Sequence, residues 1–201
     1  MQEYPSDKDD SKFPDGREIS AFVATLASEG ERVAVIISAA RIDYVLEGIL
    51  KGLMVPHTGP SDPLFDSDRL LGSFSAKISL SYRIGLIDSE LEAAITIIRK
   101  IRNDFSHSMR PEHLGDSPHR ERVNELIKNL KNSAFYEALY SGLALHIAPA
   151  HFCAFCTGVA VVLSSLRVLE KLPARPSGSR MNFLIPRQGL LKRLPRQQPS
   201  P

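Results

Sequence analysis

A run of 29 residues, from Ala138 to Leu166, contains no Asp, Glu, Lys or Arg. A stretch of that length and composition belongs either in a protein core or in a lipid bilayer, because both exclude unpaired charge. Pro149 divides the run and several His and Ser residues interrupt it, so it lacks the unbroken apolar character of a membrane helix. We therefore predict that residues 150–170 form a buried final helix and that the chain does not span a membrane.

Helical spacing of apolar residues dominates the rest of the chain. The clearest example is the stripe of Ala94, Ile98, Ile101 and Phe105, which recur at i, i+4, i+7 and i+11. No segment alternates with the period of a β-strand. We therefore predict an all-α protein, a single helical-bundle domain of about six helices. The predicted helices cover about 17–30, 31–54, 73–86, 89–108, 120–130 and 150–170.

Local signals mark several helix ends. Ser73 and Asp88 are predicted N-caps, because short side-chain oxygens at that position accept hydrogen bonds from free backbone N–H groups. Prolines and a glycine make residues 55–67 a loop. Within that loop we expect Leu64 and Phe65 to pack onto the core.

Charge divides the chain into three parts. Residues 1–16 hold five acidic residues and two lysines, whereas residues 171–201 hold seven Lys or Arg and no acid. Both ends are predicted to be disordered, so the helical domain spans 17–170. That domain is nearly neutral and is no obvious nucleic-acid binder. The basic, proline-rich tail 171–201 is a candidate for weak, salt-sensitive binding to nucleic acid or acidic lipid, with a solubilising role as the alternative.

The chain carries no signature of secretion, of a metal or of a cofactor. Its N-terminus is polar and acidic, and two cysteines are too few for a disulfide framework, so we expect a cytoplasmic protein. Cys153 and Cys156 lack the second ligand pair of a zinc site and are expected to be buried thiols. There is no glycine-rich phosphate loop, nucleophile elbow, HExxH motif or helix-turn-helix. We predict no metal and no cofactor.

The predicted helix over 89–108 also carries a dense polar edge. Arg99, Asn103 and His107 recur at i, i+4 and i+8, and Asp104 lies beside them. A cation, an amide, a carboxylate and an imidazole on one short stretch are typical of a site that binds a polar ligand or partner. We predict that Arg99, Asn103 and Asp104 take part in binding.

Two carboxylates of the helix over 31–54 are further candidates for binding. Asp43 and Glu47 lie one turn apart beside the apolar stripe of that helix, and Lys51 follows one turn later. The simpler interpretation, which we favour, is a solvated face with a Glu47–Lys51 ion pair worth a few tenths of a kcal/mol. The alternative is that one or both carboxylates face the Arg102 edge of the later helix.

Three segments of the chain resemble the mannitol operon repressor family over roughly residues 18–130. The matching words are AARID at 39–43 with LE at 46–47, LGSFSAKI at 71–78 leading to LSYRIGLI at 80–87, and IRKIRNDFSH at 98–107, in the same order and at the same separations. The resemblance implies an all-helical fold and a role in transcriptional control. It also implies action through protein partners or indirect DNA contact, because the family has no standard DNA-binding motif of its own.

A shorter stretch is similar to the motif of HEPN ribonucleases. Arg102 is followed directly by Asn103, and His107 comes four residues after that. The resemblance implies a metal-independent endoribonuclease in which Arg102 holds the scissile phosphate and His107 is the acid or base on the 2′-hydroxyl. This enzyme is our alternative to the regulatory function.

The spacing of Arg102 and His107 constrains that alternative. Residues five apart on a straight helix point about 140° away from each other. The two side chains can meet if the helix ends near Ser106, or if a homodimer, which we expect, pairs them across its two-fold axis. The structural interpretation is that Arg102 and Asp104 pair with neighbours, while His107 caps the helix C-terminus as a cation.

Overall fold

The computed structural model describes residues 16–59 and 61–170. The expectations for the acidic segment 1–16 and the basic tail 171–201 lie outside the described residues, except at Gly16, which is the first residue of a helix rather than part of a disordered end. The described part contains no strand, which confirms the all-α fold class. Its elements are α1 (Gly16–Ser28), α2 (Glu31–Leu53), the short 3-10 helix η1 (Pro63–Phe65), α3 (Phe74–Arg83), α4 (Ser89–His107), α5 (His119–Leu130), α6 (Tyr136–Leu143) and α7 (Ala150–Glu170).

The helix α6 adds one α-helix to the six that the sequence predicts. It has only eight residues, and none of them is fully buried. A helix of that length is marginal in water, so its stability comes from packing rather than from its own propensity. The helix contacts α7. Three of its side chains pack against the core and are partly buried, namely Tyr136, Leu139 and Leu143. The sequence missed it because two turns give too short a periodic pattern.

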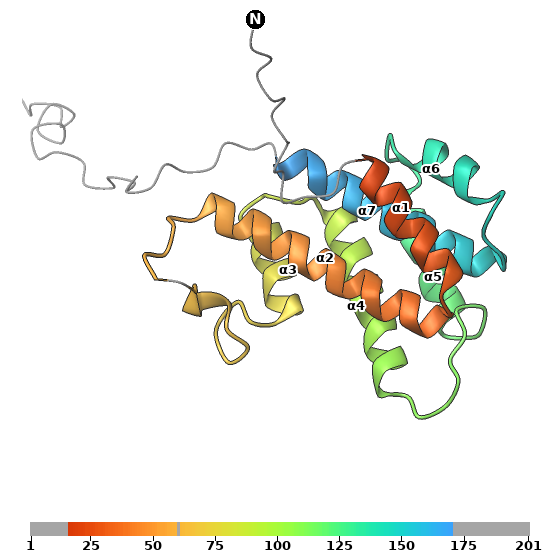
Figure 1. Cartoon of the computed structure of the whole chain (residues 1–201), viewed down its shortest axis with the longest axis horizontal. Coiled ribbons are helices and arrows are strands. Elements are labelled where there is room, and N and C mark those ends of the chain that lie inside the picture. Colours follow the sequence, from red (N-terminus) through yellow and green to blue (C-terminus); the bar gives the residue numbers. More distant parts are fainter. Residues whose placement is uncertain (1–15, 60, 171–201) are drawn as a thin grey trace, which may run out of the picture.

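The predicted apolar stripe of α4 is the inner face of that helix. Ala94, Ile98, Ile101 and Phe105 are each 0% exposed, which confirms the predicted phase of the helix. The helix α4 contacts α2, α3, α5 and α7. In Figure 1, α2 crosses in front of α4. A helix enclosed in this way holds its outer polar edge at a fixed orientation.

The predicted caps and the predicted loop contact are also present. The Asp88 carboxylate accepts a hydrogen bond from the Leu91 N–H at 2.8 Å, and the Ser73 hydroxyl accepts one from the Ala76 N–H at 3.2 Å. Each cap satisfies a backbone donor that the first turn of a helix leaves free. Phe65, in the loop before α3, is buried against the core as expected.

The uncharged run supplies the helix α7, which contacts α1, α2, α4, α5 and α6. Among the described helices, the segment Ala150–Leu169 alone is long and apolar enough to cross a membrane, and 67% of its most apolar window is buried inside the protein. Figure 1 shows α7 passing behind α1. A Cβ atom at Gly158 would lie 2.6 Å from Leu126 Cδ2, so the missing side chain lets α5 approach α7 closely. The burial of α7 fits the predicted core helix, while the cytoplasmic location stays a prediction.

Both cysteines lie on the buried side of α7, where burial raises the pKa of their thiols. The pKa of Cys156 rises to about 12, mainly because burial disfavours the thiolate. The pKa of Cys153 is also raised by burial, although a hydrogen bond with Thr157 acts in the opposite sense. The thiolate is the form that reacts and binds metal, so neither thiol is suited to those roles.

We therefore expect both thiols to be unreactive in the native protein. At a pH of about 8, Ellman's reagent should label neither cysteine over the time in which it labels both in concentrated guanidinium chloride. The measurement is the absorbance of the released thiolate. Rapid native labelling of either cysteine contradicts the placement of α7 in the core.

Candidate functional site

The structure does not bring Arg102 and His107 together within one chain. The helix α4 continues to His107, and the Ser108 N–H still donates to the Asp104 carbonyl at 2.9 Å. The helix therefore does not end near Ser106, and the two side chains point about 140° apart. His107 is exposed, whereas Arg102 is half-buried. One subunit alone cannot aim both groups at one phosphate.

The other residues of the α4 edge have separate environments. Asp104 pairs with Arg122 of α5, so this predicted binding residue joins two helices. Asn103 is half-buried beside it. The Nε atom of Arg99 is buried and has no hydrogen-bond partner in the part of the chain that the structure describes. Within the described residues, the Arg102 guanidinium has no ion-pair partner, so the predicted pairing with neighbours holds for Asp104 but not for Arg102.

Asp43 and Glu47 converge on a lysine of α3 rather than on the Arg102 edge. The Nζ atom of Lys77 lies 2.9 Å from Asp43 Oδ1 and 2.7 Å from Glu47 Oε2. The predicted Glu47–Lys51 pair is present as well, at 2.5 Å. Lys77 itself is only 3% exposed. The predicted Glu47–Lys51 ion pair is therefore confirmed. The prediction that this face of α2 is solvated is wrong, because Lys77 of α3 covers Asp43 and Glu47.

Burial and pairing act against each other in this cluster. Burial alone raises the pKa of the Glu47 carboxyl, but hydrogen bonds and charge from Lys51 and Lys77 more than offset it, so its pKa lies below the usual range. Burial likewise lowers the pKa of Lys77, but the hydrogen bond to Glu47 and the ion pair with Asp43 more than offset this, so its pKa is raised. The cluster is charged near neutral pH, and it ties α3 to α2.

A buried histidine that was not predicted from the sequence lies between the end of α4 and the start of α5. His119 is 1% exposed, its Nε2 atom lies 2.9 Å from Glu112 Oε2, and its ring stands edge-on to Phe105 at 5.0 Å. Hydrogen bonds from Ser108 and His119 hold the pKa of the Glu112 carboxyl below its usual range. His119 Nδ1 also lies 4.0 Å from Asp104 Oδ2. No spacing rule could reveal this group, because Glu112 comes from an irregular loop.

The loop between α4 and α5 is held to the start of α2. The Arg32 guanidinium donates to the carbonyls of Ser108 and Arg110 at 2.8 and 3.0 Å. The Glu31 carboxylate accepts a hydrogen bond from the Leu114 N–H at 2.9 Å. Charged groups around the end of α4 are thus largely used to hold the fold. These contacts hold the loop between α4 and α5 against α2.

The most unusual surface is an exposed apolar row on α2. Val33, Ile36, Ile37 and Tyr44 are 41%, 37%, 42% and 61% exposed, and exposed Ala40 lies between them. These five residues, which we call the α2 row, recur at helical spacing over three turns on the side away from the buried stripe. Contiguous apolar surface on a helix is typical of a contact with another molecule. This second apolar face of α2 is not among the features predicted from the sequence, because the longer stripe of Val35, Ala39, Ile42 and Leu46 dominates the helical pattern.

Comparison of the chain with protein-family models, with curated proteins and with solved structures gave no match. In the described ranges 16–59 and 61–170, no group of three or more His, Cys, Asp or Glu side chains is placed to hold a metal ion.

Proposed function

We propose that this chain is a regulatory protein that acts by protein–protein contact, and that the α2 row is its contact surface. The exposed apolar row is the observation that carries this proposal, because enzymes need convergent polar groups whereas docking helices need an apolar face. Two further features support it. Asp104 is engaged with Arg122, and Arg102 and His107 diverge on an unbroken helix.

The occupant of the α2 row in this proposal is a second copy of the chain. A two-fold interface pairs the same patch on both subunits, and a helix can form one by crossing its own copy antiparallel. A crossing centred on Ala40, the smallest residue of the row, places Tyr44 against Ile36 of the partner subunit. Ile36, Ala40 and Tyr44 of each subunit then meet apolar groups of the other around the crossing point, and burying this surface drives association.

The resemblance to the mannitol operon repressor family supports transcriptional control as the process regulated. The words that carry the resemblance include Asp43, Lys77 and Asp104, and these residues lie in the ion pairs that join α2 to α3 and α4 to α5. The resemblance thus covers the framework of the domain. In this proposal the cytoplasmic homodimer reaches DNA indirectly, through protein partners.

The first test is the oligomeric state. The wild type should be a dimer by light scattering coupled to gel filtration, and Ile37→Asp should be monomeric, because it puts a charge at the centre of the apolar contact. Its free energy of unfolding as a monomer should change by less than about 0.5 kcal/mol, since Ile37 is already exposed. Leu145→Asp is the matched control, because Leu145 is 81% exposed but lies away from the row. A monomeric wild type, or a dimeric Ile37→Asp, contradicts the proposed interface.

The second test separates regulation of transcription from cleavage of RNA. In the native host, deletion of the gene should change the rate of transcription initiation at its target operon and leave the half-life of the message unchanged. Ile37→Asp should reproduce the deletion. A change in half-life alone, or cleavage of labelled RNA by the purified wild type in EDTA that His107→Ala abolishes, would favour the ribonuclease function instead.

A further inference from the structure

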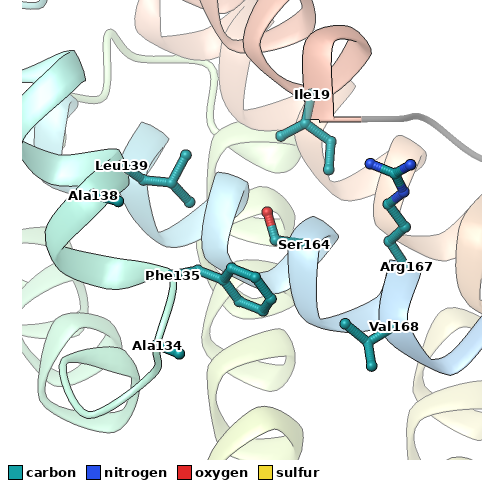
Figure 2. A pocket seen from close by; sticks show the side chains of 8 residues that line it. All are labelled: Ile19, Ala134, Phe135, Ala138, Leu139, Ser164, Arg167 and Val168. Carbon is teal, nitrogen blue, oxygen red and sulfur yellow. The ribbon is translucent and has the colours of Figure 1, made fainter.

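A pocket of about 430 Å³ opens between α1, α6 and α7, on a part of the molecule that the proposed function does not use. Its volume is within the range of small-molecule sites, which is roughly 300–1,000 Å³. Figure 2 shows the side chains that surround it. They are Ile19, Ala134, Phe135, Ala138, Leu139, Ser164, Arg167 and Val168.

The walls of the pocket are mostly apolar. Phe135 and Val168 remain 36% and 55% exposed, so part of this apolar surface faces solvent rather than the core. Leu139 of α6 and Ile19 of α1 form the opposite sides (Figure 2). A ligand with a hydrocarbon body gains free energy by covering such walls, because apolar surface is then removed from water.

Two polar groups lie together on the α7 side of the pocket. Ser164 and Arg167 are three residues apart on α7, so they lie on one side of the helix. In Figure 2 the Ser164 hydroxyl points into the space between Ile19 and Phe135, and the Arg167 guanidinium lies beside Ile19. Throughout the part of the chain that the structure describes, neither side chain makes a hydrogen bond or ion pair to protein. Both groups are therefore free to bind a ligand.

The charge of the pocket favours a negatively charged ligand. Arg167 is the first charged residue after the uncharged run, and no carboxylate of the described ranges 16–59 and 61–170 lines the pocket. A single guanidinium beside apolar walls favours a single negative charge, and its planar donors match the two oxygens of a carboxylate. A hydroxyl next to it supplies a further donor to the same group.

We propose that this pocket binds an amphipathic monocarboxylate such as a medium-chain fatty acid. The carboxylate lies on Arg167 and accepts a hydrogen bond from Ser164, and the hydrocarbon chain lies between Phe135, Leu139 and Ile19. The site is independent of the α2 row, so its test succeeds or fails separately from that of the proposed function.

The experiment uses sodium decanoate as the probe and decanol as its uncharged counterpart, with binding to the full-length chain measured by calorimetry. The wild type should bind decanoate with one site and bind decanol at least about tenfold more weakly, because decanol lacks the charge-assisted hydrogen bonds. Arg167→Gln should weaken the binding of decanoate roughly tenfold or more and leave the affinity for decanol unchanged. Ser164→Ala should weaken decanoate less than this.

Two control variants make the result specific. Arg69→Gln removes a cation that is largely exposed and distant from the pocket lining, and it should bind decanoate as the wild type does. Ile37→Asp should also bind normally, because it alters only the α2 row. No binding of decanoate to the wild type, equal affinity for decanol, or wild-type affinity in a folded Arg167→Gln each overturns the proposal.

A measurement on the wild type alone covers the case in which Arg167→Gln fails to fold. Titration of isotopically labelled protein with decanoate should shift the NMR signals of the Arg167 side chain and of Phe135 and Leu139 first. Shifts confined to residues outside the pocket lining place the fatty acid elsewhere and overturn the assignment of the pocket.

Discussion

Replacing Ile101 with aspartate is expected to unfold the protein at room temperature. Ile101 is 0% exposed in the middle of the α4 stripe, so Ile101→Asp removes a packed apolar side chain and buries a carboxylate without a partner. The loss of packing alone costs about 2–5 kcal/mol, and the unpaired charge adds several more. Together these effects approach the whole stability of an ordinary domain, which is about 5–15 kcal/mol.

The control for Ile101→Asp is Asn103→Ala on the same helix. Asn103 is half-buried and has no side-chain hydrogen bond within the described residues, so its removal should cost less than about 1 kcal/mol. Alanine also favours the helix more than asparagine does. The measurement is the urea midpoint of unfolding followed by circular dichroism. Similar midpoints for the two variants would show that the phase assigned to α4 is wrong.

The second large effect is expected at Lys77. The substitution Lys77→Met keeps most of the side-chain volume but removes the cation that Asp43 and Glu47 share. Breaking a buried ion pair from one side costs about 3–5 kcal/mol. Because the two carboxylates are 30% and 25% exposed, water screens part of this loss, and we expect about 2–3 kcal/mol. Lys51→Met, which removes the outer and 42% exposed cation, should cost less than about 1 kcal/mol.

The pH dependence of the Lys77 effect has a defined sign. The lowered pKa of Glu47 gives stability that is present above its usual value of 4.5 and is lost as the pH falls through the folded-state pKa. The raised pKa of Lys77 gives stability that is present below its usual value of 10.5 and is lost as the pH rises through the folded-state pKa. The stability difference between wild type and Lys77→Met should therefore be largest between these values. A difference that does not change with pH would show that packing, rather than charge, accounts for it.

Most of the framework could be predicted from the sequence because it depends on short-range rules. The α4 stripe follows from 3.6-residue periodicity, and the Asp88 and Ser73 caps follow from the chemistry of a helix start. The long uncharged run similarly indicated that α7 is a core helix. These features depend only on residues close together in the chain, so they can be predicted without knowledge of the fold.

The tertiary polar contacts could not be predicted in the same way. Lys77 lies on the buried face of α3, one turn from Phe74 and from Ser81. Its carboxylate partners come from α2, which no pattern within α3 indicates. His119 likewise depends on a loop carboxylate, Glu112, that has no regular spacing from it. The pocket at Arg167 requires α6, the one α-helix that was not predicted. Each of these groups is defined by how the helices are placed, and periodicity does not determine that.

The central place of α7 has a consequence for synthesis of the chain. Ribosomes make proteins from the N-terminus, and α7 is the last of the described helices to leave the exit tunnel. The faces of α1, α2, α4, α5 and α6 that contact it stay open until then. This apolar surface of the nascent chain is therefore exposed until α7 has been synthesised. Final closure of the core awaits the arrival of Val159 and its neighbours on α7, which are fully buried once in place.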